Sequence, residues 1–289
     1  MSQLLSLAPP GRVVLVPERG EMFVRDSGAE SARVGTVLLL HGWMFGADLN
    51  WITVYHPLQD AGYRVIAVDH RGHGRGIRSA QPFRIEDCAD DAVALLEELG
   101  TGPVLVVGYS MGGAIAQVMA RRRPDLVVGA VLCATTDQWR DNYRMRVFWR
   151  TMSLLQFALT HSSHRFWASI LRRNGMTAGN EVVDWIIGEL DRGDPRDIAE
   201  AGREMSRFDS REWVGTIRVP VDVICPTRDR LVPPSFQRKL AQHIPGARLF
   251  EVKGDHTVVG DHPERYVPVL IEALEDVASR ARRPQTVAS

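Results

Sequence analysis

The sequence predicts an α/β fold, in which a mostly parallel sheet of about eight strands carries helices on both faces. Short apolar runs alternate with longer polar or helical segments, which is the spacing of repeated βαβ units. The chain has 289 residues, of which 45% are hydrophobic and 24% charged, so it can bury a large core. Between residues 137 and 213 the alternation stops, and this predicts one large domain that carries a helical insertion.

The apolar runs give the expected strands in chain order. The first two form a hairpin joined at Arg19 and Gly20, and the next four are separated by polar or helical segments. The last two strands follow the insertion. The eight runs are residues 12–17, 21–26, 34–40, 64–68, 104–107, 126–132, 221–225 and 248–252.

Four helices are expected in the core. Residues 84–99 carry apolar side chains at helical spacing, and Gly100 stops them. A second helix follows the fifth strand, and the last two are expected over residues 233–243 and 263–278. The tail after Arg280 is expected to fray.

The core domain is expected to consist of residues 1–136 and 214–289, and residues 137–213 should form a helical cap. Seven arginines lie between residues 138 and 175 against one acid, and charge alone would make them a solvated face. Large apolar side chains in the same segment recur at spacings near three and four. Because such a face either packs on the core or lines a pocket, it predicts substrate contacts at four aromatic residues, Trp139, Tyr143, Phe148 and Trp149.

Composition narrows the function classes. Lys+Arg and Asp+Glu are each 35, so no net field draws the chain toward nucleic acid. The three cysteines are odd in number and widely spaced, which gives neither a disulfide framework nor a metal-ligand cluster and favours a cytoplasmic location. The N-terminus lacks the features of a signal peptide, and no apolar run reaches the ~18–20 residues that span a bilayer.

One segment carries most of the chemical content. Residues 108–113, GYSMGG, lie between the strand VLVV and the helical pattern AIAQVMARRR. A sharp turn from strand to helix that exposes a serine hydroxyl strains the backbone, and only tiny residues two positions either side escape collision. The N–H groups that open the helix favour an oxyanion there. Ser110 is therefore the predicted nucleophile, and a plain Gly/Ser turn is the alternative.

A serine hydroxyl needs a base, and that base needs a carboxylate. His256 is the best placed of nine histidines, because it follows the last strand at the edge where strand carboxyl ends gather. His262 opens the final helix and is expected to cap it or lie on the surface. Asp229 follows the strand at 221–225 and is the predicted carboxylate, with Asp255 as the competing choice.

The order Ser110, Asp229 and His256, together with the elbow and the sheet, resembles the α/β-hydrolase family over nearly the whole chain. Residues 41–43, HGW, resemble its oxyanion loop, and residues 69–74, DHRGHG, resemble its Gly-rich turn. The resemblance implies the fold and the catalytic triad. It also implies an oxyanion hole formed by the backbone N–H groups of Trp43 and Met111.

Four polar residues of these two loops have a structural interpretation. His41, His70 and His73 are expected to be hydrogen-bonding loop anchors. Asp69 is expected to order its own turn.

These features predict a serine hydrolase that cleaves a carboxylic ester, lactone or thioester through an acyl-enzyme, with no cofactor and no metal. The expected partner is a small acyl ester with an apolar acyl chain, with no nucleic acid and no stable membrane insertion. The sequence does not indicate an oligomeric state. An acyltransferase or perhydrolase would use the same triad.

Several family alternatives stay open. Relatives that open epoxides or remove halide place Asp at the elbow, where Ser110 stands, and epoxide hydrolases usually have Pro where Met44 stands. Hydrolases of ring-cleavage products often place Trp where Thr257 stands, which disfavours C–C bond hydrolysis. Cofactor-free dioxygenases also carry a Trp like Trp43 and need only a His/Asp pair. A fold-sharing binding protein with a silent triad is the alternative outside enzymes.

Overall fold

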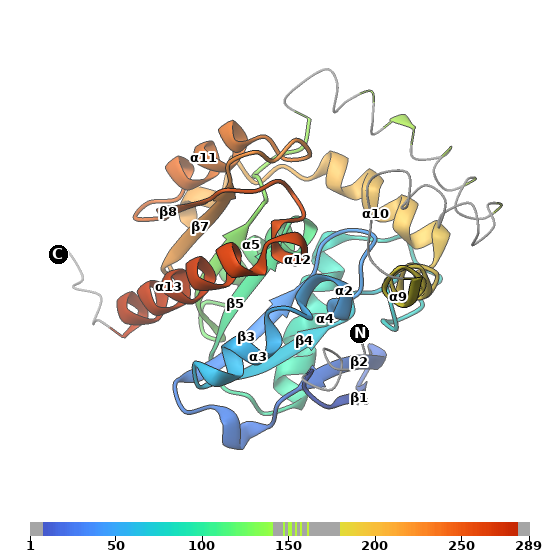
Figure 1. Cartoon of the computed structure of the whole chain (residues 1–289), viewed down its shortest axis with the longest axis horizontal. Helices are drawn as coiled ribbons and strands as arrows, with labels where there is room; N and C mark the ends of the chain where they lie inside the picture. Colours follow the sequence, from blue (N-terminus) through green and yellow to red (C-terminus); the bar gives the residue numbers. More distant parts are fainter. Residues whose placement is uncertain are drawn as a thin grey trace.

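An eight-stranded sheet in the order β1-β2-β4-β3-β5-β6-β7-β8 organises the protein, as seen in the computed structural model (Figure 1). The structure describes residues 8–140 and 180–282, together with residues 147, 150, 151, 154, 157 and 161. β1 (Gly11–Val16) and β2 (Gly20–Asp26) form the predicted hairpin, and β2 pairs antiparallel with β4 (Tyr63–Val68). The remaining pairs are parallel, so the predicted mostly parallel sheet is confirmed.

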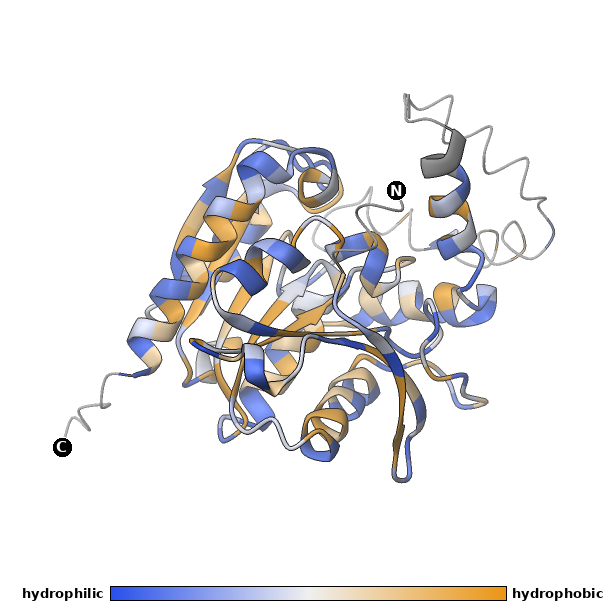
Figure 2. Cartoon of the chain, turned by 60° about the horizontal axis from the view of Figure 1, so that its bottom comes forward, coloured by the Kyte–Doolittle hydropathy of each residue, from blue (hydrophilic) through white to orange (hydrophobic). Residues whose placement is uncertain are grey.

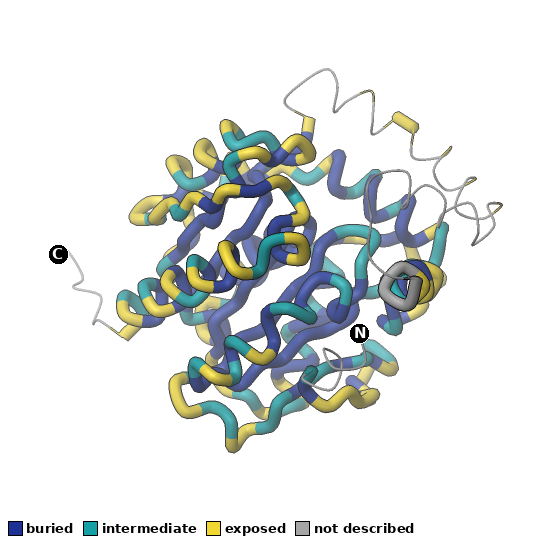
Figure 3. Tube along the Cα trace, viewed as in Figure 1, coloured by how far each residue is buried: buried dark blue, intermediate teal, exposed yellow. Residues whose placement is uncertain are grey.

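The parallel strands form because their sequences are apolar on both faces, as expected of strands covered by helices on each side. They are β3 (Gly35–Leu40), β4, β5 (Val104–Tyr109), β6 (Val127–Cys133) and β7 (Val221–Pro226). The edge strand β8 (Arg248–Val252) also pairs parallel, but its sequence RLFEV mixes polar and apolar residues and three of its five residues are exposed. In Figure 3 the central strands are dark blue along their length, while exposed residues gather on the outer helices.

Alternate residues of each central strand enter two separate cores. Leu38 and Leu40 pack against one face, with α4 (Ile85–Glu98), α5 (Met111–Arg122) and α11 (Pro234–His243). Val37 and Leu39 pack against the other, with α2 (Ala47–Trp51), α3 (Tyr55–Asp60), α12 (Val258–Asp261) and α13 (Pro263–Ala281). Figure 2 shows the apolar strands between these helix layers. The predicted arrangement of helices on both faces is confirmed.

Three short helices were not predicted from the sequence. α2, α3 and α12 have five, six and four residues, which is too short for a helical period to show. They fill connections beside the predicted oxyanion loop and beside His256. The described residues also contain two 3₁₀ helices of three residues each, Ala29–Ser31 and Val214–Thr216. The tail after residue 282 lies outside the described residues.

The segment predicted to form a cap leaves and rejoins the core at one place. Gln138 and Asp209 pair in an isolated antiparallel bridge, and Ser210 N–H donates to the Asp137 carbonyl at 2.9 Å. Its described part holds α9 (Asn180–Leu190) and α10 (Pro195–Arg207). This closure supports the boundaries 137–213, which remain a prediction. No helix of the described residues is both long and apolar enough to cross a membrane.

The contact between α10 and the turn after β4 should respond to pH. Asp197 lies against Gly72, and burial together with Asp194 and Glu200 raises the pKa of Asp197 to about 6. Because the folded protein holds this proton more tightly than the unfolded chain, the stability linked to Asp197 is present below about pH 4 and is lost as the pH rises through about 6. Asp197→Asn should therefore raise Tm at pH 7.5, on the order of 2 °C.

A thermal unfolding series between pH 4 and 7.5 measures this effect. The gain from Asp197→Asn should disappear at pH 4, where the native carboxyl is already protonated. Glu212→Gln, at an exposed position, is the matched control and should leave Tm unchanged at both pH values. An equal change of Tm at the two ends of the series would contradict the assignment.

Candidate active site

Ser110 lies at the sharp turn between β5 and α5. Its backbone has φ 53° and ψ −114°, a strained combination for a residue with a side chain. Three hydrogen bonds hold this backbone: Ser110 N–H donates to the Cys133 carbonyl at 2.8 Å, and the Ser110 carbonyl accepts from Thr135 Oγ1 and Gly113 N–H at 2.8 and 2.9 Å. The turn is therefore fixed by the end of β6 and by the helix that it opens.

The two glycines of the elbow are required by close backbone approach. A Cβ at Gly108 would lie 2.3 Å from the Gly112 carbonyl oxygen, and one at Gly112 would lie 2.0 Å from the Leu40 carbonyl oxygen. Both distances are far below van der Waals contact, so larger residues would force the turn open. The spacing G-x-S-x-G thus has a steric cause in this chain.

His256 and Asp229 form a hydrogen-bonded pair. His256 Nδ1 lies 2.7 Å from Asp229 Oδ2, and the Asp229 side chain is fully buried. Asp229 also accepts from Leu231 N–H and Val232 N–H at 2.9 and 2.8 Å, and from Gln237 Nε2 at 3.1 Å. These donors hold the carboxylate against the imidazole. A neutral His256 then keeps its proton on Nδ1, which leaves Nε2 able to accept a proton.

Asp255 is hydrogen-bonded to Thr257 rather than to His256. Its carboxylate accepts from the N–H and hydroxyl of Thr257 at 3.1 and 2.8 Å, and these bonds lower the pKa of Asp255. His262 is partly exposed and stands at the N-cap position of α13, where its side chain makes no capping hydrogen bond and its Nδ1 lies 3.3 Å from Glu264 Oε1. The geometry therefore pairs His256 with Asp229 rather than with its sequence neighbour.

The elbow and the histidine loop meet at Tyr109. Its hydroxyl donates to the His256 carbonyl at 2.9 Å, and the two rings pack edge to face with centroids 5.8 Å apart. Among the described residues no hydrogen bond joins Ser110 Oγ to His256. Catalytic hydrogen bonds are often long without substrate and tighten in the complex. The three predicted triad residues thus lie on adjoining loops at the carboxyl ends of β5, β7 and β8.

The predicted oxyanion loop also reaches the serine. A Cβ on Gly42 would lie 3.4 Å from Ser110 Cβ, and Gly42 N–H donates to Asn50 Oδ1 at 2.9 Å. Trp43 follows, and its indole Nε1 donates to the Ile198 carbonyl of α10 at 2.7 Å. Met111 is the first residue of α5, so its N–H belongs to the group that has no acceptor within the helix. Both predicted donors therefore come from segments that adjoin Ser110.

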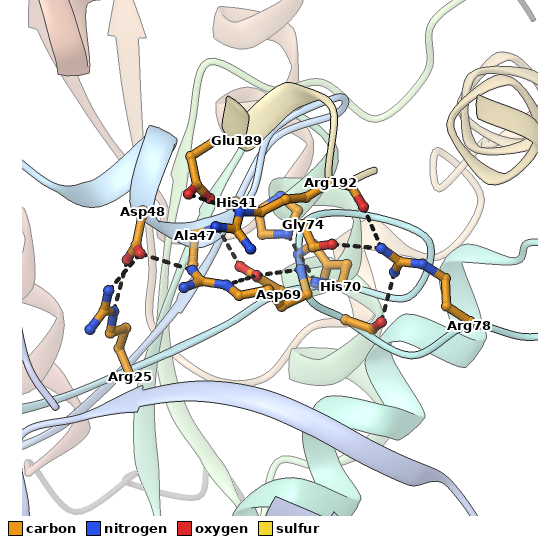
Figure 4. Close-up of polar contacts among 12 residues, drawn as sticks. Arg25, His41, Ala47, Asp48, Asp69, His70, Gly74, Arg78, Glu189 and Arg192 are labelled. Carbon is orange, nitrogen blue, oxygen red and sulfur yellow. Dashed lines mark hydrogen bonds and ion pairs between the residues drawn. The ribbon is translucent and has the colours of Figure 1, made fainter. Parts of the chain in front are cut away.

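The loop histidines are buried, as their interpretation as anchors requires. His41 Nδ1 contacts the Gly42 carbonyl at 2.7 Å, and His41 Nε2 accepts from His70 N–H at 2.9 Å (Figure 4). His73 Nδ1 contacts the Arg71 carbonyl at 3.0 Å. Burial lowers the pKa of all three, that of His73 to about 3, so they remain uncharged at neutral pH.

Asp69 orders its own turn, as expected. Its carboxylate accepts from Ala47 N–H at 2.7 Å and from Arg75 N–H at 2.8 Å. Asp48 is held in turn by Arg25 and Arg75, which makes a polar cluster beside the oxyanion loop (Figure 4). Glu189 of α9 lies beside the same cluster and comes from the segment predicted to form the cap.

The cap residues predicted to contact substrate divide into two groups. Trp139 is 2% exposed and packs edge to face with Phe208, with ring centroids 5.7 Å apart. Trp139 also belongs to the buried cluster that contains Leu38 and Leu40, and this placement favours packing on the core. Tyr143, Phe148 and Trp149 lie outside the described residues, so the substrate contacts stay a prediction.

Sequence reasoning missed the residues that support the site from other elements. Asn50 holds Gly42, Gln237 holds Asp229, and the Tyr109 hydroxyl holds the His256 loop. None belongs to a recognisable pattern except Tyr109, which occupies a variable position of the elbow motif. In the part of the chain that the structure describes, no three His, Cys, Asp or Glu side chains are placed to hold a metal ion.

The chain is similar to known proteins in sequence and in structure. Residues 35–263 match the family model of the alpha/beta hydrolase fold. A pimeloyl-[acyl-carrier protein] methyl ester esterase from Neisseria meningitidis is 28% identical, over 84% of this chain and 95% of that protein. A non-heme chloroperoxidase from Streptomyces lividans is 30% identical, over 86% and 94%. The structure of an esterase from Thermogutta terrifontis has a TM-score of 0.75 and 25% identity, over 93% and 99%.

Proposed function

The chain belongs to the α/β-hydrolase fold family, and on this premise we propose that it hydrolyses carboxylic esters with Ser110 as the nucleophile. The observation that carries the proposal is the buried Asp229–His256 pair, which lies against the residue next to Ser110. Relatives named as esterases support the same reaction class. Esters, lactones and thioesters would share the path, because each presents a carbonyl carbon and a leaving group.

The mechanism follows from the placement of these groups. His256 Nε2 takes the proton of Ser110 Oγ as this oxygen attacks the carbonyl carbon. The N–H groups of Trp43 and Met111 stabilise the resulting oxyanion. The bond to the leaving group then breaks, the leaving group takes the proton from His256, and an acyl-serine remains. A water molecule, deprotonated by His256, releases the acid and restores Ser110.

The assay should include hydrogen peroxide as a second acyl acceptor, because one relative is named as a non-heme chloroperoxidase. Hydrogen peroxide in place of water would attack the same acyl-serine and release a peracid, while Ser110 regains its proton. Both outcomes share the first half-reaction. Measuring peracid alongside acid, with peroxide present and absent, separates them.

We propose that the acyl group is apolar and of medium length. The aromatic residues Tyr143, Phe148 and Trp149 of the predicted cap support this, since apolar side chains at helical spacing make one hydrophobic face. With p-nitrophenyl esters, kcat/KM should rise from the C2 to about the C8 acyl chain, by up to roughly 0.8 kcal/mol, about fourfold, for each buried methylene. The panel should include lactones and acyl thioesters, and Ser110→Ala serves as its blank.

The arginines between residues 138 and 175 could instead recognise an anionic group on the substrate. If they grip an anionic group, an acid-bearing ester should be preferred over a neutral one of equal length, and this preference should weaken in high salt. A fall in kcat/KM with every added methylene would overturn the proposal of an apolar acyl group.

A cytoplasmic location is also part of the proposal, and the three cysteines, all free and buried, support it.

A further inference from the structure

His41 makes two hydrogen bonds to backbone groups that differ in polarity. His41 Nε2 lies 2.9 Å from the N–H of His70, which can only donate. His41 Nδ1 lies 2.7 Å from the carbonyl oxygen of Gly42, which can only accept. A neutral imidazole has one donor nitrogen and one acceptor nitrogen, so these partners fix the tautomer with the proton on Nδ1.

The bond to Gly42 acts on the peptide that joins Gly42 to Trp43. No peptide of the described chain is cis, and in a planar trans peptide the C=O and N–H bonds point in opposite directions. Holding the Gly42 carbonyl on one side therefore aims the Trp43 N–H to the other side. The loop touches Ser110, since a Cβ on Gly42 would lie 3.4 Å from Ser110 Cβ.

We propose that His41 is a positioning residue, whose Nδ1–H holds the Gly42 carbonyl so that the Trp43 N–H points at the oxyanion of the tetrahedral intermediate. This rests on the proposed ester hydrolysis and assigns a step of it to a residue that does not touch the substrate. Preorganised donors are effective because they need no reorientation during the reaction.

The surroundings keep His41 in this role. Its side chain is fully buried, and its ring lies 4.1 Å from the His70 ring and 5.6 Å from the His73 ring, centroid to centroid. Asp69 immediately precedes His70 and fixes the turn that supplies the His70 N–H (Figure 4). On the other side of the peptide, Gly42 N–H is held by Asn50. The donor and the acceptor of His41 are therefore both attached to ordered backbone.

Two substitutions separate the two hydrogen bonds. In His41→Asn the amide nitrogen can occupy the place of Nδ1 and donate to the Gly42 carbonyl. In His41→Gln the longer amide can reach the place of Nε2 and accept from His70 N–H, while the bond to Gly42 is lost. His41→Gln should lower kcat for an aryl ester roughly 10- to 100-fold with little change of KM, because the donor acts on the transition state. His41→Asn should retain most of kcat.

The binding of an inhibitor that forms a tetrahedral adduct depends on the oxyanion hole. This measurement therefore distinguishes a positioning role of His41 from a purely structural role. A trifluoromethyl ketone with the acyl chain of the ester forms a hemiketal oxyanion with Ser110, whereas the methyl ketone of the same chain binds as a carbonyl. His41→Gln should weaken the binding of the trifluoromethyl ketone by the same factor by which it lowers kcat/KM. It should leave the binding of the methyl ketone unchanged. His73→Gln is the matched control, because it removes a buried imidazole whose Nδ1 contacts the Arg71 carbonyl instead of Gly42.

The tautomer can be read in the wild-type protein as well. The ¹⁵N shifts of the His41 ring should report protonated Nδ1 and bare Nε2. A proton on Nε2, or equal losses of kcat in His41→Asn and His41→Gln when both are folded, would overturn the proposal. If instead Ser110→Ala keeps the wild-type activity, the proposed function fails, and this result is independent of the His41 variants.

Discussion

Ser110→Ala is expected to lower kcat for aryl ester hydrolysis by roughly 10⁴- to 10⁶-fold, because no acyl-enzyme can form without the hydroxyl. The substitution should leave the fold intact. The hydrogen bonds that hold the elbow use the backbone of Ser110, and its hydroxyl takes no part in them. Circular dichroism and Tm should therefore match the wild type.

The matched control is Ser279→Ala, at an exposed position of α13. It should hydrolyse the ester at the wild-type rate. Residual activity of Ser110→Ala within tenfold of the wild type would remove Ser110 from the mechanism. Such a result would favour a reaction that needs only the His/Asp pair.

Asp229→Asn is expected to lower kcat by on the order of 10⁴-fold. The carboxylate holds the proton on His256 Nδ1 and stabilises the imidazolium that forms when Ser110 is deprotonated. An amide of the same shape presents a donor or a weaker acceptor, so the ring can take the wrong tautomer. Gln237, which donates to the same carboxylate, would also lose its acceptor.

Asp255→Asn distinguishes the two candidate acids. Its carboxylate contacts Thr257 and lies one residue from His256, so the variant should keep kcat within a few-fold of the wild type. If Asp255→Asn were the damaging change and Asp229→Asn were mild, the acid of the triad would be misassigned. Steady-state kinetics with one aryl ester decides between them.

Much of the fold could be predicted because its signals are local in the sequence. The apolar runs are buried on both faces, so strands such as β3 and β5 are visible from composition alone. The elbow is equally local, since Gly108 and Gly112 meet a steric need of the turn that they flank. The Asp229 and His256 loops follow strands that end at one edge of the sheet, and topology then brings them together.

The supporting contacts could not be predicted, because they join residues that only the fold makes neighbours. Asn50 reaches Gly42 from a helix of five residues, which is too short to show a helical period, and Gln237 reaches Asp229 from α11. The tautomer of His41 depends on the His70 N–H, 29 positions away along the chain. Trp139 shows a further limit, because an apolar stripe looks the same in sequence whether it packs on the core or lines a pocket.

Locating the covalent adduct tests the central claim most directly. The protein is treated with a fluorophosphonate, or quenched in acid during turnover of an aryl ester, and then digested and analysed by mass spectrometry. One phosphonyl or acyl group should be found on Ser110, and Asp229→Asn should acquire it far more slowly. An adduct on another residue, or an active enzyme that never carries one, would contradict the account.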